Sequence, residues 1–208
     1  YRRATAPARS LLDVMLLMAF FPHLVAGPIV RASDLLPQFA RAPRLTREAA
    51  THGLLLILWG LFKKTVIASE LAVRLVDPVF FDPSAHGAVD IALATYAYAV
   101  QIYCDFSAYS DMAIGTAQAL GFSVMENFDA PYLVASVKDF WKKWHISLTS
   151  WLREYIYFPL GGSRCKKWRT YFNVMVVFAV SGLWHGAAFS FVVWGLLNGA
   201  YQVIGEIT

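Results

Sequence analysis

Two histidines in aromatic surroundings are the side chains best suited to acid–base chemistry in this sequence. His185 follows Trp184 inside Thr170 to Gly205, a stretch with no Asp, Glu, Lys or Arg, and His145 follows Trp144. An imidazole titrates near pH 6.5, and burial favours its neutral form, which can take a proton from a hydroxyl. We expect His185 to be enclosed and uncharged. From the residues alone, a histidine that merely packs as a hydrogen-bond donor stays open as an alternative.

Other combinations of reactive residue types are weaker. Asp105, Ser107, Ser110 and Asp111 gather among aromatic residues, but Asp and Ser commonly serve as caps and helix-end charges, and we favour that interpretation for the two aspartates. The sequence has no His-Glu-x-x-His motif or close pair of ligands, so we predict no metal site. It has no Gly-x-Ser-x-Gly turn, which disfavours a Ser-His-Asp triad.

The composition indicates a membrane protein. Hydrophobic residues make up 58% of the 208 residues and charged residues only 15%, whereas soluble domains are about 25% charged. The apolar periodicity is helical, and Thr170 to Gly205 is long enough for one long span or two shorter ones. We therefore expect an all-α polytopic transmembrane bundle in a lipid bilayer. We further expect residues 1–208 to be an interior fragment of a single transmembrane domain, because the chain starts at Tyr1 and ends just after apolar residues.

The net charge of +4 does not indicate nucleic-acid binding, because the basic residues cluster between apolar segments, where they set topology. The positive-inside rule predicts that two basic loops face the cytoplasm and that the acidic segment Asp77 to Asp90 faces outward. The basic loops contain Arg31, Arg41, Arg44 and Arg47, and Arg164, Lys166, Lys167 and Arg169.

Three further segments would position these residues. Lys138 to Phe158 has aromatic and apolar residues at steps of three and four, which predicts one amphipathic helix at the interface, with Trp141 and Leu148 at helical spacing from His145. Val14 to Val30 contains two prolines, which predicts a kinked or re-entrant piece. Lys63 and Lys64 interrupt another apolar stretch and must snorkel or line a polar cavity.

Six ordered blocks of sequence resemble the membrane-bound O-acyltransferases, in the branch that O-acetylates alginate. The resemblance covers nearly the whole chain, and the ordered set is far more specific than any one block. The blocks are Phe21–Arg31, Gly60–Ala68, Gln101–Gly115, Glu126–Phe128, Phe140–Leu148 through Gly162, and Gly182–Ala187. Cys104 and Ala108 depart from the usual Phe and Gly of that branch, which puts the packing near Asp105 in doubt but not the reaction.

The resemblance implies that His185 is the active-site histidine and that His145 is an accessory lining the same tunnel. We expect Trp184, Trp144, Asp105 and Ser107 to contact substrate. The implied enzyme binds no cofactor and transfers an acetyl group from acetyl-CoA or another acyl thioester. The acceptor would be an exported polysaccharide such as alginate, or a periplasmic or extracellular acyl-accepting protein, and the location the bacterial cytoplasmic (inner) membrane.

Two other functions fit the residue pattern without the resemblance. A transporter or channel could use the histidines to relay protons, since proline-broken apolar segments and polar midplane residues suit it. A non-catalytic scaffold for a periplasmic acetyltransferase would not need His185.

Overall fold

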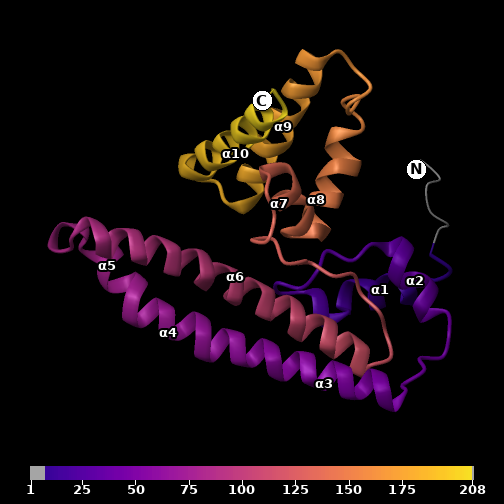
Figure 1. The fold of residues 1–208 in the computed structure, drawn as a ribbon. Coiled ribbons are helices and arrows are strands. Elements are labelled where there is room, and N and C mark those ends of the chain that lie inside the picture. The colour runs from indigo at the N-terminus through magenta and orange to yellow at the C-terminus, as the bar shows by residue number, and fades with distance from the viewer. Residues whose placement is uncertain (1–7, 208) are drawn as a thin grey trace. The chain divides into compact units, whose positions relative to one another are not determined.

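The chain is entirely helical over the residues that the structure describes. The computed structural model describes residues 8–207, and over that range the elements are helices joined by turns, with no strand beyond a single isolated bridge (Figure 1). The prediction of an all-α protein is thus confirmed. The helices form two compact units, one ending at Asn127 and the other beginning at Phe128, and each is described by itself.

The first unit is built around the long helix α6 (Ala88–Ala119), against which α3 (Arg47–Phe62) packs. Glycines bring these two helices close: a Cβ added to Gly115 would lie 2.4 Å from the carbonyl oxygen of Gly53. Short segments extend α3, and they run alongside α6 in Figure 1. They are η2 (Lys63–Ala68), α4 (Ser69–Leu71), η3 (Ala72–Val76), α5 (Asp77–Phe81) and η4 (Pro83–Ala85).

The proline-containing start of the chain folds into short pieces, and the interruption agrees with the kink predicted over Val14 to Val30. Helix α1 (Leu11–Ala19) ends before Pro22, and a turn of 3₁₀ helix, η1 (Phe21–His23), precedes α2 (Ala32–Phe39). Proline cannot donate the backbone hydrogen bond that a continuing helix needs. Phe20 and Leu35 form a small core with Ala117 of α6, so these pieces are fastened to the C-terminal part of that helix.

The aspartates of the polar cluster do not cap helices, and our interpretation of them was wrong. Helix α6 runs without a break through Asp105 and Asp111. The buried amine of Lys63 lies 2.7 Å from Asp111 Oδ2 and donates to Ser107 Oγ at 2.7 Å, while Lys64 pairs with Asp105. The ion pairs compensate charges that would be costly in an apolar hairpin, so the helix has no reason to end there.

The second unit contains five helical elements. They are α7 (Val137–Lys143), α8 (Ile146–Leu152), the π-helical η5 (Arg153–Tyr157), α9 (Lys167–His185) and α10 (Phe189–Ile207). The single amphipathic helix predicted over Lys138 to Phe158 is wrong, because Trp144 is extended and His145 is left-handed between α7 and α8. The apolar Thr170 to Gly205 stretch forms the paired helices α9 and α10.

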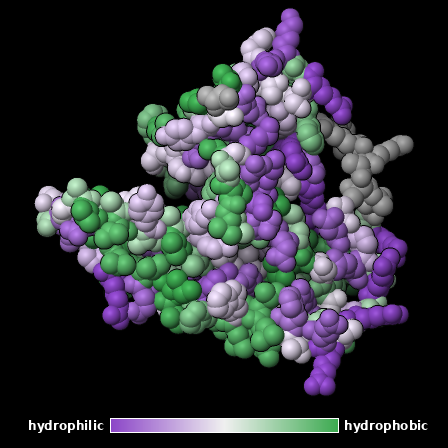
Figure 2. Space-filling view, in the orientation of Figure 1, coloured by the Kyte–Doolittle hydropathy of each residue, from purple (hydrophilic) through white to green (hydrophobic). Residues whose placement is uncertain are grey.

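Apolar side chains remain at the surface of the first unit. Figure 2 shows them over the hairpin of α3 and α6, where Leu54, Leu58, Trp59, Leu93 and Tyr96 are all more than half exposed. Among the helices of residues 8–207, none combines the length and apolar character required to cross a bilayer.

Candidate active site

Both candidate histidines line one cavity within the second unit. The cavity has a volume of about 810 Å³, and side chains from α7, α8, η5, α9 and α10 form its walls. Trp141, Trp144, His145, Ser181 and His185 lie along it. The structure thus brings together two residues from separate blocks of the sequence, as the prediction of a shared tunnel requires.

His185 is the last residue of α9, and close helix packing places it. A Cβ added to Gly182 would lie 2.3 Å from the carbonyl oxygen of Phe191, and Gly195 meets the Phe178 carbonyl equally closely, so only glycine permits this approach of α9 and α10. The imidazole of His185 consequently stacks with Phe191 at 6.4 Å between centroids and meets Trp194 edge-on at 5.1 Å. Its side chain is exposed, which corrects the expectation that it is enclosed.

His145 is the buried partner, with only 5% of its surface exposed. Its backbone has φ 47° and ψ 54°, the left-handed conformation that costs a residue with a Cβ about 1–2 kcal/mol. Such strain persists where neighbouring structure enforces it and gathers at functional sites. Burial, and secondarily the nearby His185, lowers the pKa of His145 to about 4, so this imidazole is neutral at physiological pH.

A short segment before α7 braces this strained turn. Phe128 forms an isolated antiparallel bridge with Trp144, and the backbone amide of Asp129 donates to the Lys143 carbonyl at 3.0 Å. The Asp129 carboxylate also lies 3.0 Å from Lys143 Nζ. Because the Lys143 carbonyl and Trp144 are engaged this way, α7 stops and the chain turns at His145. Sequence reasoning missed this brace, since nothing in the helical spacing of the segment signals a bridge to residues outside it.

The two tryptophans predicted to contact substrate lie at the site. Trp184 packs edge-on against His145 at 5.9 Å and against His185 at 5.0 Å. Trp144 lines the cavity and stacks on Phe140. Asp105 and Ser107 lie in the first unit, where lysines engage them, and their contact with substrate stays a prediction.

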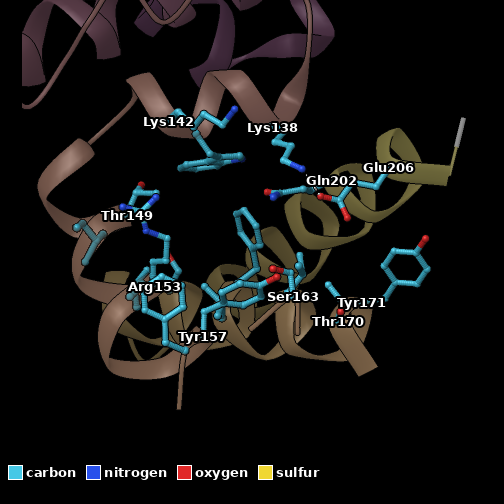
Figure 3. Close-up of a pocket in the computed structure, with 18 of the residues that line it drawn as sticks. Lys138, Lys142, Thr149, Arg153, Tyr157, Ser163, Thr170, Tyr171, Gln202 and Glu206 are labelled. Atoms are coloured by element: carbon cyan, nitrogen blue, oxygen red, sulfur yellow. Dashed lines mark hydrogen bonds and ion pairs between the residues drawn. The ribbon is translucent and has the colours of Figure 1, made fainter. Parts of the chain in front are cut away.

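Polar and charged side chains line the cavity as well. Figure 3 shows Lys138 of α7 and Glu206 of α10 there, joined by an ion pair of 2.7 Å, with Tyr157, Ser163 and Gln202 nearby. Within residues 8–207, no group of three or more His, Cys, Asp or Glu side chains is arranged to hold a metal ion. The arrangement therefore offers two imidazoles, aromatic walls and an ion pair, which suit proton transfer on an organic substrate.

Comparison with known proteins identifies the family. The sequence matches the model of the MBOAT, membrane-bound O-acyltransferase family over residues 8–207. It is 42% identical over 206 residues to a probable alginate O-acetylase of Azotobacter vinelandii, covering 98% of this chain and 40% of that protein. It is 41% identical over 190 residues to a peptidoglycan O-acetyltransferase of Helicobacter pylori, covering 90% of this chain and 36% of that protein.

A more distant relative is named for transfer of D-alanine rather than acetyl. A teichoic acid D-alanyltransferase of Bacillus subtilis is 27% identical over 192 residues, which is 86% of this chain and 47% of that protein. The chain spans about two fifths of the length of the probable alginate O-acetylases that it matches. With a family match over nearly every residue and 42% identity to a named relative over 98% of its own length, the chain belongs to the membrane-bound O-acyltransferase family.

Proposed function

We propose that the protein is an O-acyltransferase that moves an acetyl group from a cytoplasmic thioester donor to hydroxyls of an exported polysaccharide such as alginate. The observation that carries this proposal is the placement of His145 and His185 on one cavity. Helix packing alone does not require two histidines from distant blocks to line the same cavity. Catalysis that uses both imidazoles on one substrate does require it.

His185 acts as the general base in this proposal. An imidazole nitrogen takes the proton of the acceptor hydroxyl while the hydroxyl oxygen attacks the thioester carbonyl carbon. The carbon–sulfur bond then breaks, and the departing thiolate takes the proton from the imidazolium. The exposure of His185 toward the cavity, which the sequence did not predict, gives an acceptor access to the ring. Base catalysis of this kind contributes about 10²- to 10⁴-fold.

His145 serves a different purpose. With a pKa near 4 its imidazole is uncharged at neutral pH, so it cannot act as a cationic acid. A neutral imidazole offers one N–H donor and one acceptor. We infer that His145 orients a polar group of the substrates. We also infer that Trp184, which packs against both imidazoles, holds the two rings in fixed positions relative to each other.

The acceptor follows from the relatives together with the chemistry. Two of the relatives are named for O-acetylation of alginate and of peptidoglycan, and both are glycans with free hydroxyls. We propose an exported glycan of this kind, with acetyl-CoA or another acyl thioester as donor and no bound cofactor. An acyl-accepting protein on the outer side of the membrane is the other acceptor compatible with the attack by a hydroxyl.

We place the protein in the bacterial cytoplasmic membrane as a multi-pass protein. Membership of a membrane-bound family supports this location, and so do the exposed leucines and aromatic residues over α3 and α6, since soluble proteins rarely expose large contiguous apolar surfaces.

The test is reconstitution of the full-length protein in liposomes with acetyl-CoA labelled in the acetyl group and alginate oligosaccharides. We expect labelled ester on the glycan. Movement of label or protons across the membrane without ester formation would instead identify a transporter or channel. Ester formed only when a separate periplasmic acetyltransferase is added, and formed equally well by His185→Ala, would identify a scaffold.

A further inference from the structure

An unpaired hydrogen-bond donor lies on the cavity wall at Trp141. This residue belongs to α7, and its ring lines the cavity that contains both histidines. Its indole Nε1 is buried and has no hydrogen-bond partner among the described residues. The other buried side-chain atoms without a partner, on His23, Gln101 and Asn173, do not line this cavity. Trp141 is therefore the place where a buried polar atom and the candidate active site coincide.

The indole is held firmly by other rings. Phe140 and Phe178 each pack edge-on against it at 5.3 Å between centroids, and Trp194 does so at 5.9 Å. Trp194 also packs edge-on against His185 at 5.1 Å. Trp141 and His185 thus contact the same intervening ring, which puts the unpaired N–H on the same part of the cavity as the proposed base.

The free energy of this arrangement favours a ligand that accepts a hydrogen bond. A buried donor without a partner costs about 1–3 kcal/mol, and three aromatic rings pack against Trp141. An indole N–H donates and cannot accept, so its partner must be an acceptor. The surrounding rings are apolar. They favour an uncharged carbonyl oxygen as the acceptor over a phosphate or a heavily hydrated glycan hydroxyl.

We propose that the Nε1–H of Trp141 donates a hydrogen bond to a carbonyl oxygen of the acyl donor. This inference rests on the proposed function. Two carbonyls of a pantetheine thioester have the required chemistry: the reacting thioester carbonyl, and an amide carbonyl of the pantetheine arm. Kinetics separate them. Loss of a donor to the reacting oxygen lowers kcat by about 10²- to 10³-fold, because charge develops there. Loss of a donor to an amide raises KM by about 2- to 10-fold and leaves kcat unchanged.

The sharpest test replaces Trp141 in the full-length protein with 3-benzothienylalanine, introduced by stop-codon suppression. Sulfur then stands in place of N–H, while the size and shape of the ring are kept. The matched control is the same replacement at Trp168, which is 65% exposed on α9 and does not line the cavity. The probe is labelled acetyl-CoA, and kcat and the KM for acetyl-CoA are measured with alginate oligosaccharides at saturating concentration.

We expect the Trp141 replacement to lower kcat or raise KM by these amounts while the Trp168 replacement changes neither. Wild-type kcat and KM in a correctly inserted Trp141 variant would overturn the inference. A conventional Trp141→Phe variant provides a second comparison, and its thermal midpoint shows whether the smaller ring has loosened the packing. If the wild-type protein itself transfers no acetyl group, it is the proposed function that fails. If the wild type and the Trp141 replacement transfer equally, only the role of Trp141 fails.

Discussion

The indole of Trp184 packs edge-on against the buried imidazole of His145, with 5.9 Å between the ring centroids. The same indole lies 5.0 Å from the ring of His185, its neighbour in the chain. One side chain at the end of α9 therefore contacts both histidines, of which His145 directly precedes α8. The two imidazoles share one neighbouring ring.

Acid should weaken the fold through His145. The pKa of this buried imidazole is about 4, against about 6.5 in an unfolded chain. Between these values the unfolded chain binds a proton that the folded chain does not. The free energy of unfolding therefore falls as pH decreases from about 6.5 to 4, by about 3 kcal/mol at most, and is unaffected by this residue above pH 6.5.

The measurement is the thermal midpoint of the purified protein against pH, with His145→Gln as the control because glutamine does not titrate. The variant should lose this part of the pH dependence. An unchanged profile in His145→Gln would show that His145 is not the titrating group.

The left-handed backbone of His145 should make glycine the better replacement. His145→Ala and His145→Gly both remove the imidazole, but only alanine keeps a Cβ in a conformation with φ 47°. We expect the glycine variant to have the larger free energy of unfolding by about 1 kcal/mol. Ser150 of α8 provides the contrast, because in an ordinary helix alanine is favoured over glycine by about 1 kcal/mol. The same order at both positions would argue against a strained His145.

The close approach of α9 and α10 should not tolerate a methyl group at Gly182. The added Cβ would meet the Phe191 carbonyl oxygen at 2.3 Å, and backbone must move to relieve it. We expect Gly182→Ala to cost about 1–3 kcal/mol and to reduce acetyl transfer, because Phe191 stacks on His185. Gly205→Ala is the stability control, since nothing lies within 4 Å of its added Cβ. Equal thermal midpoints for the two variants would contradict this packing.

Removing one partner of the buried ion pair of Lys63 and Asp111 should destabilise the protein more than removing both partners. Lys63→Met leaves the Asp111 carboxylate with its 2.7 Å partner gone, and we expect a loss of about 3–5 kcal/mol. The double variant Lys63→Met/Asp111→Leu removes both charges and should recover most of that loss. Thermal midpoints of the three proteins test this. A double variant less stable than the single variant would rule out an uncompensated charge as the cause.

Local patterns in the sequence predicted much of the fold, but contacts between distant residues lay beyond their reach. Helical periodicity located α9 and α10, and the prolines located the broken start. The turn at His145 depends on the bridge from Phe128 to Trp144, and the continuity of α6 through Asp111 depends on Lys63. The spacing of nearby residues predicts neither contact.

The candidate site shows the same division. The blocks that contain Trp144-His145 and Trp184-His185 predicted that these residues act together. Trp144, His145 and His185 line one cavity, and their joint action stays a prediction. The exposure of His185 and the unpaired N–H of Trp141 follow from how α7, α9 and α10 pack. Such packing arises only when the helices assemble. The sequence alone does not contain it, and for this reason the prediction of an enclosed His185 was wrong.

The most direct test of the account is acetyl transfer by His185→Ala. Full-length wild type, His185→Ala and the control His86→Ala, whose histidine lies outside the cavity, would be compared for label passed from acetyl-CoA to alginate oligosaccharides at equal amounts of inserted protein. We expect His86→Ala to match the wild type and His185→Ala to lose at least about 10²-fold. Transfer by His185→Ala at the wild-type rate would contradict the assignment of His185 as the base.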